Sequence, residues 1–200
     1  MVDVQAITQL HRICVERWHR RDIDNPYEGF LRLVCEQHER NYRLWHEEDI
    51  ARSKDVADKD IAQVKRNIDR LNQQRNDLIE RLDDALIAEL AMTEVVPVAG
   101  ARLNTETPGS VIDRLSILAL RLYHMQEQAD RSDADPQHCE KAKARLVVLR
   151  EQHSDLSNAL TELLADLFSG RKRLKVYRQF KMYNDPTMNP YLYAAKKPAA

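Results

Sequence analysis

The stretch SVIDRLSILALRLYHM, residues 110–125, decides the fold, because apolar side chains surround nearly the whole helix that it predicts. Such a helix is typical of the centre of a bundle, where other helices cover all of its faces. Its few polar side chains then need partners inside the protein. Asp113 and His124 share one face of this helix, whereas Arg114 and Arg121 share another.

Four further helices are predicted around this one from the spacing of apolar residues and from the positions of glycine and proline. The two longest carry leucine-rich seams at alternating three- and four-residue steps, which is bundle or coiled-coil spacing. We therefore predict an all-α helical bundle. Its five helices are expected at residues 3–21, 27–53, 57–92, 109–130 and 135–169.

One domain is expected over residues 1–193, followed by a frayed tail at 194–200. Segment 95–109, VVPVAGARLNTETPG, is the one substantial irregular connection, and the sequence leaves open a short strand, a lid or a plain crossover. After Gly170 the chain turns basic and aromatic, with Asn-Asp-Pro and Asn-Pro steps that prevent a continuous helix. This tail either binds an anion or RNA, or offsets the dipole of the preceding helix while its aromatic side chains pack on the bundle.

The charge balance limits the classes of partner. The chain has 31 basic and 32 acidic residues, so no general electrostatic attraction to nucleic acid or membrane is expected. No run of eighteen apolar residues occurs and the N-terminus resembles no leader, so we expect an unprocessed cytoplasmic protein without a membrane span. Cys14, Cys35 and Cys139 lie far apart, which favours buried thiols over disulfides.

Residues 43–52, RLWHEEDIAR, contain the first candidate site. His46 lies one turn before Asp49, a spacing that allows a carboxylate to orient an imidazole for proton transfer. Glu48 and Arg52 belong to the same short stretch. The competing interpretation is a solvated helix face, because such pairs are common on surfaces.

A polar stripe on the third helix is the second candidate. It comprises Lys65, Asp69, Asn72, Asn76, Glu80 and Asp83, with Arg75 in the neighbouring apolar seam. A surface helix shows such a stripe anyway, but two asparagines favour a buried polar network, because asparagine is a poor helix former.

The fourth helix begins with Thr107 as a predicted N-cap and Pro108 at its first position. Free backbone N–H groups at such a start are able to hold a phosphate or a carboxylate, with Arg114 one turn further on. An ordinary capped helix has the same geometry.

Metal-ligand spacings are incomplete. Glu16 and His19 form one Glu-x-x-His element, whereas a di-iron bundle needs two. Neither Cys35 with His38 nor His11 with Cys14 belongs to a four-ligand zinc pattern. We therefore predict no metal site, and the cofactor stays open.

Four stretches, WHEED at 45–49, VKRNIDRLNQQRNDLIERLD at 64–83, NTETPGSVIDRLSILALRLYHM at 104–125 and VYRQFKMYNDPTMNPYLY at 176–193, together resemble the bacterial domain-of-unknown-function family 4254. The resemblance implies a setting beside glycosyltransferases of lipopolysaccharide or other surface glycans, and phosphorylated sugars or nucleotide sugars as ligands. The positions that match its motifs are His46, Glu48, Asp49, Arg52, Lys65, Asp69, Asn72, Arg75, Asp77, Glu106, Asp113, Arg114 and His124.

Two functions remain open. In the first, a polar cleft between the second, third and fourth helices binds or acts on a phosphorylated sugar. His46 and Asp49, with Glu48, then supply acid and base groups, while Arg52, Lys65, Arg75 and Arg114 hold the anion. In the second, the protein is a non-catalytic module that forms a homodimer or docks on a glycosyltransferase through the seams of its two long helices.

Overall fold

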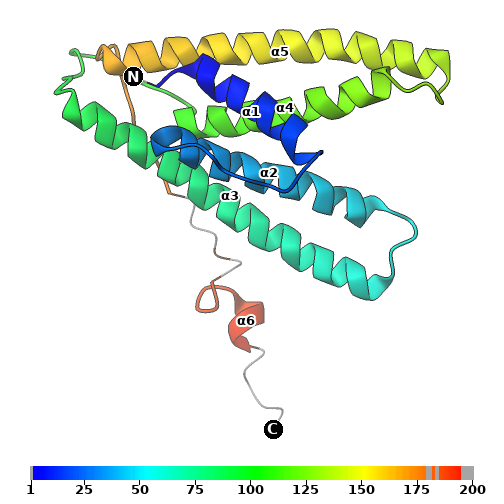
Figure 1. The fold of residues 1–200 in the computed structure, drawn as a ribbon. Helices are drawn as coiled ribbons and strands as arrows, with labels where there is room; N and C mark the ends of the chain where they lie inside the picture. Colours follow the sequence, from blue (N-terminus) through cyan, green and yellow to red (C-terminus); the bar gives the residue numbers. More distant parts are fainter. Residues whose placement is uncertain (1, 179–181, 183–184, 195–200) are drawn as a thin grey trace.

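In the computed structural model, helices account for nearly all of the regular structure of the described residues, which are 2–178, 182 and 185–194 (Figure 1). The all-α prediction is confirmed. All five predicted helices are present, and their ends differ from the prediction by three residues at most. The helices are α1 (Val4–Trp18), α2 (Gly29–Arg52), α3 (Asp58–Met92), α4 (Pro108–Ala129), α5 (Pro136–Phe168) and the short α6 (Pro190–Ala194).

Two antiparallel helical hairpins, α2 with α3 and α4 with α5, form the body of the bundle, and α1 packs against α2, α4 and α5 (Figure 1). Helix α4 contacts each of the other four long helices, which confirms its predicted central place. Its Ile112 and Leu115 are fully buried, together with Leu82 and Leu86 of α3 and Leu160 of α5. Shared burial of aliphatic side chains from three helices fixes how the two hairpins pack.

The irregular connection before α4 contains a short strand. β1 (Arg102–Leu103) pairs in parallel with β2 (Lys172–Arg173), which follows α5. Gly170 precedes β2 with φ of +73°, and a Cβ there would lie 2.7 Å from the carbonyl oxygen of Val96. Of the three alternatives for this connection, the short strand is therefore the one observed.

The start of α4 is packed directly on α3. Thr107 caps the helix and its side chain accepts the N–H of Ser110, as predicted. The Gly109 N–H donates to Oδ1 of buried Asp83 over 2.7 Å, and a Cβ on Gly109 would lie 2.6 Å from the carbonyl oxygen of Ile79. The helix start therefore does hold a carboxylate, but that of Asp83 within the same chain, which occupies the position that a bound phosphate would take.

The leucine seams of the long helices face inwards. On α5, Leu146, Leu160, Leu163 and Leu167 are buried, and on α3 the same holds for the seam from Val64 to Leu82. Cys14 and Cys35 are buried free thiols as predicted, whereas Cys139 is partly exposed. No helix in the described part of the chain is long and apolar enough to cross a membrane.

The basic C-terminal segment is tied to the bundle at several described points. Arg171 and Lys172 pair with Asp166 of α5 at 2.7 and 3.2 Å. Arg178 donates to Glu80 and Asp84 of α3 over 3.1 and 2.6 Å. Tyr177 is largely exposed, so the predicted packing of this tyrosine on the bundle is wrong. Phe180, Lys181, Tyr183 and all but the first residue of the predicted frayed tail lie outside the described residues.

Candidate functional site

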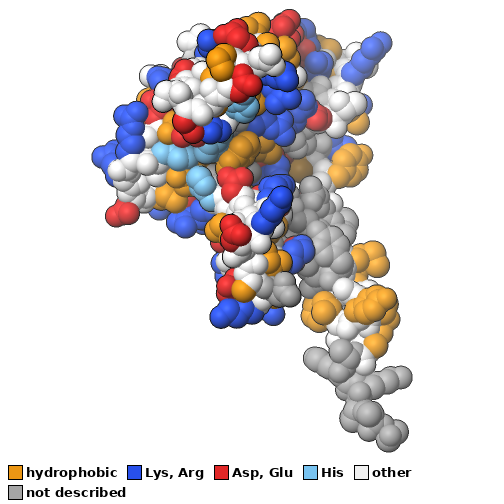
Figure 2. Space-filling model, turned by 90° about the vertical axis from the view of Figure 1, so that its right-hand side faces the viewer, with side chains coloured by type: hydrophobic (Ala, Val, Ile, Leu, Met, Phe, Trp, Pro, Cys, Tyr) orange, Lys and Arg blue, Asp and Glu red, His pale blue; other side chains and the backbone are white. Residues whose placement is uncertain are grey.

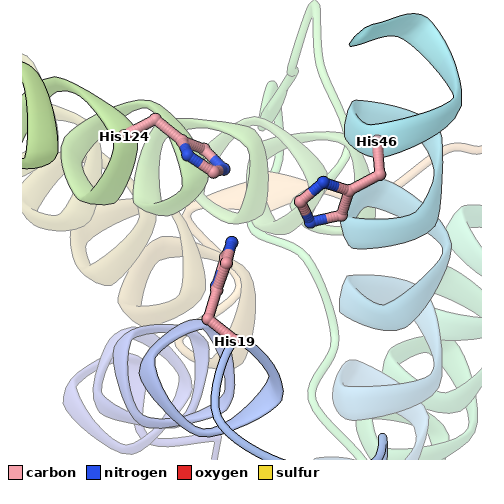
Figure 3. A group of neighbouring side chains, drawn as sticks. All are labelled: His19, His46 and His124. Carbon is pink, nitrogen blue, oxygen red and sulfur yellow. The ribbon is translucent and has the colours of Figure 1, made fainter. Parts of the chain in front are cut away.

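Three histidines from three helices meet at one point of the bundle. His19 follows the last residue of α1, His46 lies in the second half of α2, and His124 lies in the second half of α4. One ring nitrogen of each lies within 4.8 Å of the corresponding nitrogens of the other two. Figure 3 shows the three rings turned towards a common centre.

Hydrogen bonds fix the orientation of two of these rings. Nδ1 of His19 lies 2.7 Å from the carbonyl oxygen of Val15, one turn back in α1. Nδ1 of His124 lies 2.8 Å from Oε2 of Glu127, one turn further along α4. Carbonyl and carboxylate oxygens only accept, so both Nδ1 atoms carry a proton, and in the neutral form of each ring Nε2 presents a lone pair.

Aromatic side chains surround the histidines. Tyr123 stacks on His19 with ring centroids 4.2 Å apart, and Trp45 stacks on His124 at 4.9 Å with only 9° between the planes. Tyr42 meets His46 edge-on at 4.5 Å. These contacts restrict ring rotation and line the cluster with low-dielectric surface.

The cluster lies just below the surface of the molecule. On the face drawn in Figure 2, histidine side chains gather beside Lys and Arg side chains. Nε2 of His19, His46 and His124 is nevertheless buried in each case and has no hydrogen-bond partner among the described residues. Burial, followed by repulsion from His19 and His124, lowers the pKa of His46 below its usual value, which favours its neutral form.

A second polar cluster lies further towards the start of α4. Asp113, 4% exposed, accepts hydrogen bonds at Oδ1 from Gln37 at 2.6 Å, Asn41 at 3.0 Å and Nε of Arg75 at 2.7 Å. A second Arg75 nitrogen donates to the other oxygen of Asp113. These hydrogen bonds raise the pKa of Arg75 despite its partial burial. These contacts to Asp113 tie α2, α3 and α4 together, although Oε1 of Gln37 is buried and has no hydrogen-bond partner among the described residues.

The Asp113 cluster continues through Ser116 to a buried histidine. Asn41 Nδ2 donates to Ser116 Oγ at 2.9 Å, and Ser116 Oγ lies 2.7 Å from Nδ1 of His38. Nε2 of His38 lies 3.1 Å from the carbonyl oxygen of His11 and must therefore carry the proton. Ser116 accordingly donates to Nδ1. Burial lowers the pKa of His38 to about 3.

A groove of about 410 Å³ opens where α2, α3 and α4 meet. Trp45, which also stacks on His124, lines it, so the groove adjoins the histidine cluster. Three guanidinium groups, one from each helix, line it as well: Arg52, Arg75 and Arg121. The other polar lining residues are Asn41, Asn72, Glu48 and Asp49.

The predicted site residues therefore fall into several places instead of one cleft. His46 and His124 belong to the histidine cluster, and Arg75 and Asp113 to the buried cluster. Glu48, Asp49, Arg52, Asn72 and also Arg75 line the groove. Asp49 is exposed and makes no hydrogen bond to His46 among the described residues, so it does not orient the ring, although its charge acts to raise the pKa of His46 against the larger effect of burial.

Four predicted ligand-binding residues lie elsewhere and pair with each other. Lys65 and Asp69 form a surface ion pair on α3, with side chains 66% and 55% exposed. Arg114 pairs with Glu106 at 2.6 Å, both half-exposed. The predicted anion contacts from Lys65 and Arg114 are therefore corrected, because each cation already has an exposed carboxylate partner and lies outside the groove.

Local spacing in the sequence did not reveal His19, Trp45, Tyr123 or Arg121 as site residues. His19 stood out only as half of one Glu-x-x-His element, and the prediction of no metal site counted ligands within single helices. The cluster draws one ligand from each of three helices, 27 and 78 residues apart in sequence (19 to 46, and 46 to 124). Only the packing of α1 against α2 and α4 brings these residues together.

The fold and the site define an all-α bundle protein with a histidine cluster and a polar groove between its helices. The chain belongs to the family described as protein of unknown function DUF4254, whose model matches residues 31–176. The matched part contains His46, His124 and the groove, whereas α1 and His19 precede it. Comparison with curated proteins and with solved structures gave no match.

Proposed function

We propose that the groove between α2, α3 and α4 binds a phosphorylated sugar or a nucleotide sugar. The observation that carries this proposal is the convergence of Arg52, Arg75 and Arg121 on one groove beside Trp45. Guanidinium groups bind phosphate oxygens through paired hydrogen bonds, and an indole is suited to the flat apolar face of a sugar or a base. The volume of about 410 Å³ falls within the range of small-molecule sites.

The charges of the groove assign different roles to the three arginines. Asp113 binds Arg75, and Glu48 pairs with Arg52 at 2.8 Å. Arg121 is exposed and forms no ion pair with any described residue, so it is the cation most available to a phosphate. Asn72 adds an amide that is able to bind sugar hydroxyls.

The biological setting comes from the family resemblance and not from the groove. We propose a cytoplasmic role in the biosynthesis of bacterial surface polysaccharide such as lipopolysaccharide, beside a glycosyltransferase. The histidine cluster, which shares Trp45 with the groove, is the part of the site where chemistry on such a ligand would take place. We propose ligand binding by the groove and assign no reaction to it.

The alternative function, a non-catalytic module that forms a dimer or docks on a glycosyltransferase, has little support in the structure. It rests on the leucine seams of the two long helices, which other helices of the same chain cover. Val147 and Val148 are the large apolar residues that α5 exposes in the described structure. Two adjacent valines make a small patch, and isolated exposed apolar residues are normal on a protein surface.

Substitution of Arg121 by alanine is expected to weaken binding of UDP-glucose and glucose 1-phosphate by about 10- to 100-fold, because one charge-assisted hydrogen bond contributes roughly 1.5–3 kcal/mol. Isothermal titration calorimetry at fixed salt measures the affinity. Arg145→Ala, which removes the same charge from an exposed position of α5, is the matched control and is expected to bind normally. Equal losses in both variants, or no binding by the unaltered protein at millimolar ligand, would overturn the proposal.

A further inference from the structure

The histidine cluster has the features of a metal site, although the spacing of its residues in the sequence matches no metal-binding motif. Three imidazole nitrogens, one from each of α1, α2 and α4, lie within 4.8 Å of one another. Their Nε2 atoms are buried and have no partner among the described residues. Buried imidazole nitrogens normally have hydrogen-bond partners, so three unpaired ones around one point require a specific explanation.

The protonation of two rings prevents a hydrogen bond between His19 and His124. His19 donates its Nδ1 proton to Val15, and His124 donates its own to Glu127. Their Nε2 lone pairs therefore face the same small space, where two acceptors repel each other. A cation at the centre removes this repulsion, because each lone pair then forms a coordinate bond to the ion.

The groups behind the rings match the outer shell of known metal sites. A histidine that binds a metal through one nitrogen usually donates its other N–H to a carboxylate or a backbone carbonyl. Here Glu127 supplies the carboxylate for His124, at 2.8 Å, and Val15 supplies the carbonyl for His19, at 2.7 Å. Stacking of Trp45 and Tyr123 on these same two rings holds them in place before any ion binds.

The donor set selects the class of ion. Neutral imidazole nitrogens suit zinc and its transition-metal neighbours, whereas magnesium and calcium prefer oxygen ligands. Tetrahedral zinc binds imidazole at about 2.0–2.1 Å, which places bound nitrogens roughly 3.3 Å apart. Where two of these nitrogens lie further apart than this in the structure, at up to 4.8 Å, binding would draw them closer together.

We infer that His19, His46 and His124 bind one divalent transition-metal ion, zinc being the best fit, through their Nε2 atoms. Three protein ligands leave the fourth position of a tetrahedral ion open, which is the arrangement of catalytic zinc sites and not of closed structural ones. Since His19 lies on the segment before residue 31, α1 completes a site whose other two ligands belong to the matched family region. The inference is independent of the groove, because zinc binding needs no organic ligand.

The test uses the untagged full chain, stripped of metal with a chelator and titrated with Zn²⁺ against a chromophoric chelator of known affinity. One tightly bound Zn²⁺ per chain is expected. Each of the variants His19→Ala, His46→Ala and His124→Ala is expected to lose at least about 100-fold in affinity, and Glu127→Gln about 10-fold. His138→Ala, at an exposed position of α5, is the control and is expected to bind Zn²⁺ as tightly as the unaltered protein.

A thermal unfolding scan keeps the inference testable if a variant is unstable. Zn²⁺ is expected to raise the Tm of the unaltered protein and of His138→Ala, but of none of the three cluster variants, because an ion stabilises only the state that binds it. Far-ultraviolet circular dichroism in chelator confirms that each variant is folded. Absence of a stoichiometric Zn²⁺ site, or a site that survives in folded His46→Ala and His124→Ala, would overturn the inference.

Discussion

Substitution of Asp113 by alanine is expected to lower the free energy of unfolding by about 3–5 kcal/mol, the cost of removing one partner of a buried ion pair. The variant leaves the partly buried guanidinium of Arg75 without its carboxylate. It also removes the acceptor of the Gln37 amide and one of the two acceptors of the Asn41 amide. Urea unfolding followed by circular dichroism measures the change.

Glu106→Ala is the matched control for this prediction. It removes one carboxylate from an arginine–carboxylate pair, but the pair with Arg114 is half-exposed. Exposed pairs contribute about 0–1 kcal/mol, so the control is expected to unfold almost like the unaltered protein. If Asp113→Ala and Glu106→Ala had the same small effect, the Asp113 cluster would not hold the three helices together.

Acidification is the second change with a large expected effect. The pKa of His38 is about 3 in the folded protein because of burial, whereas an unfolded histidine titrates near 6.5. Below pH 6.5, His38 therefore binds a proton in the unfolded chain but not in the folded protein. His38 stabilises the protein fully above pH 6.5, and this contribution falls by about 1.4 kcal/mol for each pH unit towards pH 3.

The stability of the metal-free protein is therefore expected to fall by about 3 kcal/mol through His38 alone between pH 6.5 and pH 4. Burial, and then the charge of His38, also lower the pKa of His11 well below its usual value. His11 therefore makes the stability fall more steeply with decreasing pH. His38→Gln is expected to be less stable at neutral pH, because it loses a hydrogen bond, but its pH slope is expected to be smaller by about 1.4 kcal/mol per unit. Urea unfolding in chelator between pH 4 and 7 measures both slopes, with His138→Gln as the exposed control. Parallel slopes for His38→Gln and the unaltered protein would contradict the assignment.

The sequence predicted the bundle well because local signals decide it. The apolar residues around α4 predicted its central place, and Thr107 with Pro108 predicted where it begins. The two long seams predicted α3 and α5. The short β1–β2 pair was left open as one alternative, because two-residue strands carry too few residues to show alternation.

The site was predicted only in part, because the residues of one polar stripe have different neighbours in space. Asn72 and Arg75 of α3 face the groove, while Lys65 and Asp69 of the same helix pair with each other in solvent. A groove does lie between α2, α3 and α4 as expected, but Asp113 and His124 belong to two separate clusters on α4. These lie about three turns apart along the helix.

The central claim is that α1, α2 and α4 bring three imidazoles to one point, where they hold a metal ion. An anomalous-difference map from crystals grown with one equivalent of Zn²⁺ tests it most directly. One peak is expected about 2.0–2.1 Å from Nε2 of each of His19, His46 and His124. A peak at other residues, or the three imidazoles on separate surfaces of the bundle, would contradict it.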